Sequence, residues 1–137
     1  MAKRFTLGKN ERLKSRKQIE QLFTDGKNFS LSPFRIYYRL MPIITDAQSN
    51  LQFGAGVSGK NFKRAVDRNR VKRLTREAYR VQKIQLQEIL KQKGVQLNLF
   101  FIYTGKELPV FSMMKEKVNV ILNKMIKIVN ESNSPAT

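Results

Sequence analysis

Arginine and lysine side chains gather between residues 68 and 83, and their spacing suits the binding of phosphate groups. On a helical wheel at about 100° per residue they share one continuous arc, and apolar residues occupy the opposite arc. A guanidinium is planar and can donate two parallel hydrogen bonds to phosphate oxygens. The pattern predicts an amphipathic helix that buries one face and presents a basic ridge to a polyanion. The basic arc holds Arg68, Lys72, Arg73, Arg76, Arg80 and Lys83, and the apolar arc holds Val71, Leu74, Ala78 and Val81.

The alternative for this segment is a solvated helix face whose charges pair within the helix. Such pairing needs acidic residues three or four positions from the basic ones. Only Glu77 meets that condition, relative to Arg73 and Arg80, whereas like charges at the 68/72, 72/76 and 76/80 spacings repel one another. An anionic partner therefore explains the segment better. Asp67 is expected to cap the start of the helix, and Tyr79 falls on the basic side of the wheel, where its role stays open.

A second candidate surface spans two predicted strands, at residues 34–41 and 51–57. Apolar and polar side chains alternate along both, so each strand has one outward face. An aromatic ring flanked by cations, beside a floor of glycines, suits a single-stranded nucleic acid, since the ring stacks on a base and the cations follow the phosphates. The alternative is a face covered by a helix, with Tyr37 in the core. The outward residues are Arg35, Tyr37 and Arg39 on the first strand and Gly54, Gly56 and Ser58 on the second.

The composition of the chain points to the same class of partner. Its 137 residues include 27 Lys and Arg against 10 Asp and Glu, and nucleic acid would neutralise the resulting formal charge of +17. An anionic membrane surface, or a merely basic protein, is the alternative. The hydrophobic share of 41% is too high for a disordered chain. No run of about 18 apolar residues and no signal segment appears, which favours a cytoplasmic location without membrane contact.

Catalytic chemistry by the protein itself is not expected. The chain has no Cys and no His, which excludes disulfides and thiolate metal sites and removes the commonest general base. Its carboxylates are scattered along the sequence, without the close grouping typical of a two-metal nuclease site. We therefore expect no catalytic residue and no metal ligand in this chain.

Several further elements must position the two surfaces. Ser15-Arg16-Lys17-Gln18 has capping-box spacing, so a short helix is expected from there to Gly26. The strands at 34–41 and 51–57 are predicted as an antiparallel pair joined by a loop. Helical character runs over 65–92, an apolar strand over 95–103, and a last helix follows Pro109. This order predicts one α+β domain at 15–130, with a basic arm at 1–14 and a polar tail at 131–137.

The stretch from residue 57 to residue 80 resembles the bacterial ribonuclease P protein subunit. In that family an Arg-Asn-Arg motif is followed by Lys-Arg and a further Arg on the same helix, after a V-S-x-K segment. The resemblance extends over about residues 12–130. Two positions depart from the family pattern, because Gly59 stands where a Lys is common and Ile19 where an aromatic is common. The matching residues are Val57, Ser58, Lys60, Arg68, Asn69, Arg70, Lys72, Arg73 and Arg76.

The resemblance implies a fold and an RNA-processing role. The fold would be an αβββαβα domain, with helices on an approximately four-stranded sheet and a left-handed βαβ crossover. The protein would assist endonucleolytic removal of the 5′ leader from precursor tRNA, with hydrolysis carried out by the RNA subunit and its Mg²⁺. We expect a monomer in a 1:1 complex with ribonuclease P RNA, with precursor tRNA as the substrate and no small-molecule substrate. A ribosomal or other structural RNA-binding protein without a role in cleavage is the alternative.

The expected contacts divide between the two surfaces. The basic helix would dock on the catalytic RNA, and a cleft between the sheet and the first helix would hold the leader. Tyr37 matches a family position in that cleft. The catalytic-RNA set is Arg68, Asn69, Arg70, Lys72, Arg73, Arg76 and Arg80, and the leader set is Phe23, Arg35, Tyr37, Arg39, Ser58 and Lys60.

Overall fold

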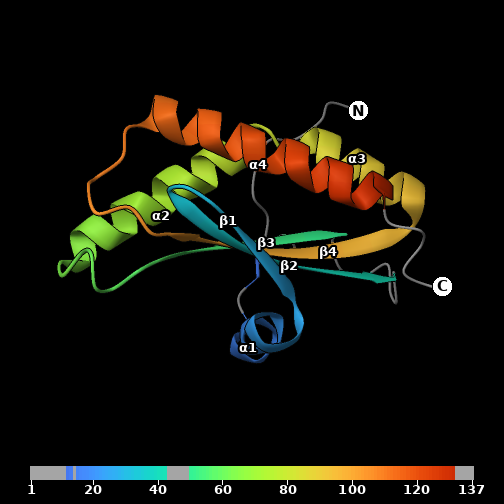
Figure 1. The fold of residues 1–137 in the computed structure, drawn as a ribbon, viewed down its shortest axis with the longest axis horizontal. Helices are drawn as coiled ribbons and strands as arrows, with labels where there is room; N and C mark the ends of the chain where they lie inside the picture. Colours follow the sequence, from blue (N-terminus) through green and yellow to red (C-terminus); the bar gives the residue numbers. More distant parts are fainter. Residues whose placement is uncertain (1–11, 14, 43–49, 132–137) are drawn as a thin grey trace.

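The computed structural model describes residues 12–13, 15–42 and 50–131, and within them a four-stranded sheet lies between two layers of helix (Figure 1). Three helices cover one face of the sheet, and the first helix lies on the other face. The α+β class and the four-stranded sheet expected from the sequence are confirmed. In chain order the elements are α1 (Arg16–Asp25), β1 (Lys27–Leu31), β2 (Phe34–Pro42), β3 (Leu51–Val57), α2 (Ala65–Arg80), α3 (Ile84–Lys93), β4 (Val95–Tyr103) and α4 (Phe111–Glu131).

The strands follow the order β1-β2-β4-β3, which corrects one expectation. We predicted that β2 and β3 would pair directly, but β4 lies between them, antiparallel to β2 and parallel to β3. Alternation along a strand determines which face each side chain occupies and carries no information about which strand lies beside it. Since β3 and β4 are parallel neighbours joined through α2 and α3, the expected βαβ connection is present. The left-handed sense of this crossover stays a prediction.

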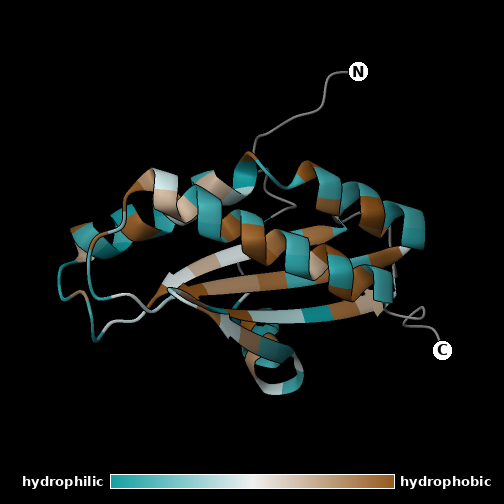
Figure 2. Ribbon diagram, turned by 45° about the horizontal axis from the view of Figure 1, so that its top comes forward, coloured by the Kyte–Doolittle hydropathy of each residue, from teal (hydrophilic) through white to brown (hydrophobic). Residues whose placement is uncertain are grey.

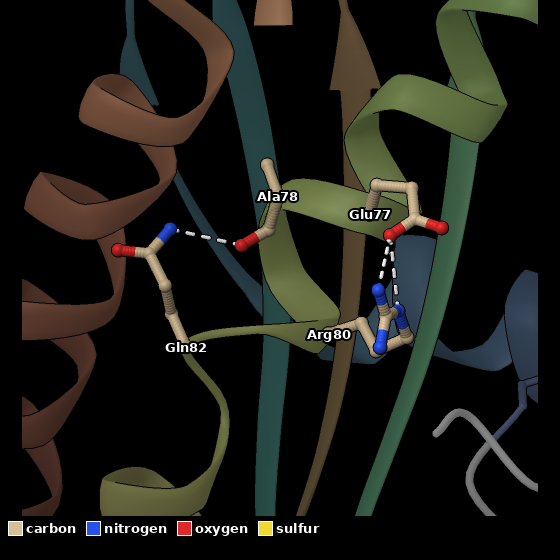
Figure 3. Close-up of polar contacts among 4 residues, drawn as sticks. All are labelled: Glu77, Ala78, Arg80 and Gln82. Carbon is tan, nitrogen blue, oxygen red and sulfur yellow. Dashed lines mark hydrogen bonds and ion pairs between the residues drawn. The ribbon is translucent and has the colours of Figure 1, made fainter. Parts of the chain in front are cut away.

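The helical stretch 65–92 holds two helices, where one was expected. α2 ends at Arg80 and α3 begins at Ile84. Between them, the Gln82 side chain donates to the carbonyl of Ala78 at 2.8 Å (Figure 3). It also donates to the carbonyl of Lys115 at 3.0 Å. The chain changes direction between the two helices, so Lys83 does not continue the helical periodicity of α2. It is 1% exposed, and its assignment to the basic arc is therefore wrong.

The core lies between the sheet and the layer formed by α2, α3 and α4. Alternating hydrophobic and hydrophilic residues along α4 show how this longest helix buries one face (Figure 2). Tyr79, whose role the wheel left open, is fully buried and stacks on Phe53 with ring centroids 3.9 Å apart. α2 contacts both β3 and α4, so its buried sector is wider than a single apolar stripe. None of the helices in the described ranges is long and apolar enough to cross a bilayer.

Candidate RNA-binding surfaces

α2 presents a row of basic side chains on the side turned away from the sheet. Val71, Thr75, Ala78 and Tyr79 are its buried residues, and helical periodicity leaves the opposite side to solvent. We call the outward row the α2 ridge. Its members are Asn69, Arg70, Arg73 and Arg76, which are exposed, and Lys72, which is half-buried.

Arg68, expected on the same surface, is turned back toward the preceding loop. One terminal nitrogen of its guanidinium donates to the carbonyls of Phe62 and Lys63, both at 2.8 Å. Its first role is therefore to hold this loop against the helix, although its remaining N–H groups could still meet a phosphate. The expectation that Asp67 caps the helix is wrong, because α2 begins at Ala65. Asp67 lies within the first turn, where its negative charge interacts favourably with the positive end of the helix dipole.

Arg80 marks the end of the basic row. Its guanidinium forms an ion pair with Glu77, with contacts of 2.6 and 3.0 Å (Figure 3). Intrahelical pairing, the alternative considered for the whole helix, therefore applies at this one position. A pair this exposed adds little to stability. It does lower the net positive charge at the C-terminal end of the helix, so the ridge is most cationic over its first turns.

The second surface lies on the opposite face of the sheet, where α1 packs on β2. The side chain of Ser15 accepts a hydrogen bond from the backbone N–H of Gln18 at 3.3 Å, which confirms the predicted helix start. α1 buries Leu22 and leaves Phe23 41% exposed. The ring of Phe23 lies 4.7 Å from that of Tyr37 and 5.4 Å from that of Phe100. We call these three residues the aromatic cluster.

Phe100 overturns the expectation that glycines leave a flat floor. Gly54 lies opposite Phe100 in the sheet, and a Cβ at Gly54 would be 2.6 Å from the Phe100 ring. A Cβ at Gly56 would be 2.9 Å from the same ring. The two glycines therefore make room for an aromatic side chain of the neighbouring strand. The sequence reasoning missed Phe100 because it lies in an apolar strand, although alternation with the buried Leu99 and Phe101 marks it as facing the other way.

The other residues expected to bind the leader lie at both ends of this surface. Arg35 lies with its guanidinium carbon 5.8 Å from the centre of the Tyr37 ring, and it donates to the Asn28 side chain at 3.2 Å. Arg39, at the other end, lines a pocket of about 480 Å³ together with Tyr38 and residues of α1, β1 and α4. Ser58 and the exposed Lys60 follow the end of β3.

The loop that carries Ser58 and Lys60 is held in place by Asn61. The Asn61 backbone N–H donates to the carbonyl of Ser58, and its side chain donates to the carbonyls of Thr104 at 3.0 Å and Gly105 at 3.3 Å. These hydrogen bonds hold the loop in one position, between the α1 face of the sheet and the first turn of α2.

The carboxylates do not form a metal site in the described part of the chain. No group of three or more acidic side chains there comes close enough to hold an ion.

The comparisons with known proteins agree on one family. The model of the family Ribonuclease P matches residues 7–126. The ribonuclease P protein component of Porphyromonas gingivalis is 37% identical over 132 residues, which cover 96% of this chain and 93% of that protein. The component of Chlorobium phaeobacteroides is 31% identical over 130 residues, covering 88% of each.

Solved structures share the fold at lower sequence identity. The ribonuclease P protein of Thermotoga maritima superposes with a TM-score of 0.62 at 24% identity, over 83% of this chain and 96% of that one. That of Staphylococcus aureus superposes with a TM-score of 0.62 at 18% identity, over 84% and 94%.

Proposed function

The chain belongs to the ribonuclease P protein family, and we propose that the two surfaces of this tRNA-processing subunit bind different RNAs. The family makes it a subunit of an endoribonuclease with an RNA partner. In our proposal the α2 ridge binds ribonuclease P RNA, and the α1 face of the sheet binds the 5′ leader of precursor tRNA in a 1:1 complex.

The observation that carries this proposal is the separation of two chemically different surfaces by the sheet. The α2 ridge is cationic and lies on one face, while the aromatic cluster lies on the other. Cations alone suit the phosphates of a folded RNA, whose bases are paired and inaccessible. Exposed aromatic rings suit an unpaired strand, whose bases can stack on them. A leader is such a strand, and mature tRNA lacks it, so the α1 face would distinguish substrate from product.

Cleavage itself is assigned to the RNA in this proposal. The described residues offer no carboxylate cluster for Mg²⁺, and the chain has neither His nor Cys. We therefore assign the Mg²⁺ ions and the catalytic centre to the RNA subunit. The contribution of the protein is binding, because cationic side chains neutralise phosphates that would otherwise need divalent ions in a compact RNA fold.

The test is a cleavage assay with precursor tRNA at low Mg²⁺ concentration. Ribonuclease P RNA from the same organism is assayed with and without the protein, and the protein is assayed alone. We expect the protein to stimulate 5′ cleavage by the RNA and to cleave nothing by itself. Cleavage by the protein alone would overturn the assignment of the catalytic centre. RNA binding without stimulation would favour a purely structural role.

A further inference from the structure

A short segment ahead of α1 lies along the free edge of β3. The backbone N–H of Leu13 donates to the carbonyl of Phe53 at 2.9 Å, and Arg12 pairs with Phe53 in a parallel bridge. The side chain of Leu13 is buried at 4% exposure, which anchors the segment. Arg12 therefore has a defined place in the fold, although it belongs to a stretch that we predicted as an extended arm.

The pairing also determines where the Arg12 side chain points. Residues paired across neighbouring strands project to the same face of a sheet. Phe53 projects to the helix-covered face, where its ring stacks on Tyr79 of α2. The side chain of Arg12 is thus directed toward α2, at the edge of the sheet.

Arg76 of α2 lies close enough to Arg12 for their charges to interact. It precedes Tyr79 by three residues, so it lies about one turn earlier on α2 and about 60° around the helix from Tyr79. Partial burial lowers the pKa of Arg76, and the positive charge of Arg12 lowers it further. Both side chains reach solvent, and neither is paired with a carboxylate among the residues that the structure describes. Two like charges that folding brings together repel unless an anion lies between them.

We propose that Arg12 and Arg76 together bind one phosphate group of ribonuclease P RNA. This inference rests on the proposed function and adds a contact from outside α2. Arg12 lies three residues before the Ser15 cap of α1, the helix that carries Phe23. The contact therefore ties the N-terminal segment, and with it the start of α1, to the bound RNA.

The test measures affinity for ribonuclease P RNA over a range of salt concentrations, with Arg12→Gln, Arg76→Gln and the double variant. Each single variant should bind several-fold more weakly. Because one phosphate is shared, the double variant should reduce the log–log salt slope by about 0.7 to 0.9, whereas two separate phosphates would reduce it by about 1.4 to 1.8. The second substitution should also weaken binding less than the same substitution does in the wild-type protein.

Thermal unfolding of the free protein separates this role from a structural one. Removing either charge relieves a repulsion, so the melting temperature should stay the same or rise while RNA affinity falls. Arg16→Gln is the matched control, since Arg16 is an exposed arginine four positions from Arg12, and its RNA affinity should stay within about twofold.

Three results would overturn the inference. They are an unchanged affinity for Arg12→Gln, strictly multiplicative losses in the double variant, or a fall in melting temperature that parallels the loss of affinity. If the wild-type protein does not bind this RNA at all, the proposed function fails with it. If Arg70 and Arg73 prove essential while Arg12 does not, the shared phosphate is excluded and the proposed function stands.

Discussion

The α2 ridge and the aromatic cluster are built in different ways. All ridge residues belong to one helix, and four of the five are exposed. The cluster takes one ring from each of three elements, α1, β2 and β4, and each ring contacts another. The ridge can therefore adapt to an RNA surface through long, flexible side chains, whereas the cluster presents a shape that packing holds in place.

This contrast predicts different responses to salt and to substitution. Binding through phosphates weakens steeply as salt rises, because counterions compete for them. Stacking on an aromatic ring depends little on ionic strength. Ridge substitutions should consequently change affinity and salt dependence with little change in stability, and cluster substitutions should change discrimination between leader-bearing and mature tRNA.

The largest effect is expected for the double substitution Arg70→Ala with Arg73→Ala. Both side chains are exposed, and two charge-assisted contacts of about 1.5 kcal/mol each correspond to about 100-fold weaker binding of ribonuclease P RNA. The salt slope should decrease by about 1.4 to 1.8. Filter binding at several salt concentrations measures both quantities. Lys91→Ala with Lys127→Ala removes the same charge from α3 and α4, and equal losses in that control would show that overall charge, not the ridge, determines binding.

Phe23→Ala should have the next largest effect, on the substrate. Stacking of a base on an aromatic ring is worth about 1–3 kcal/mol, so the affinity of the holoenzyme for leader-bearing tRNA should fall about tenfold. Binding of mature tRNA and the salt slope should not change. Phe111→Ala removes an aromatic ring of similar exposure from α4 and should leave both affinities as they are. Parallel losses for both tRNAs would place Phe23 outside the leader site.

Gly54→Ala tests whether the Phe100 ring positions the cluster. The added methyl group would lie 2.6 Å from that ring, so the ring must shift and disturb Phe23. We expect a loss of about 1–3 kcal/mol in the free energy of unfolding and about threefold weaker leader binding. Gly59→Ala is the control, because no atom lies within 4 Å of its added methyl group. If Gly54→Ala destabilises the fold and leader binding is unaffected, Phe100 has no part in the site.

The smallest effect is expected at the end of the ridge, for Glu77→Gln. Loss of this carboxylate removes the ion-pair partner of Arg80 and raises the local positive charge. Affinity for ribonuclease P RNA should rise about twofold, while stability changes by less than about 0.5 kcal/mol because the pair is partly exposed. Weaker binding by this variant would mean that the ion pair helps to orient Arg80 toward the RNA.

Local patterns account for most of what could be predicted. The capping box at Ser15, Gly26 and Pro109 marked the limits of α1 and the start of α4. Periods of two or 3.6 residues marked the outward face of β2 and the exposed arginines of α2. The resemblance to a known family added the RNA partner, which the family comparisons support. Errors occurred where strand neighbours are set by long-range contacts, as for β2 and β3, or where the chain turns, as at Lys83.

The sequence by itself determined which side chains share a helix face or a strand face, because neighbours along the chain set that geometry. It thereby placed Arg73 and Arg76 on one surface and Tyr37 on another. Only the tertiary structure decided which strands are neighbours, and with them two features of the candidate site. Phe100 fills the space over Gly54, and Arg12 lies at the edge of β3, where its charge acts on Arg76. Such contacts join residues far apart in sequence, and a repeating pattern of polarity depends only on residues that are close in sequence.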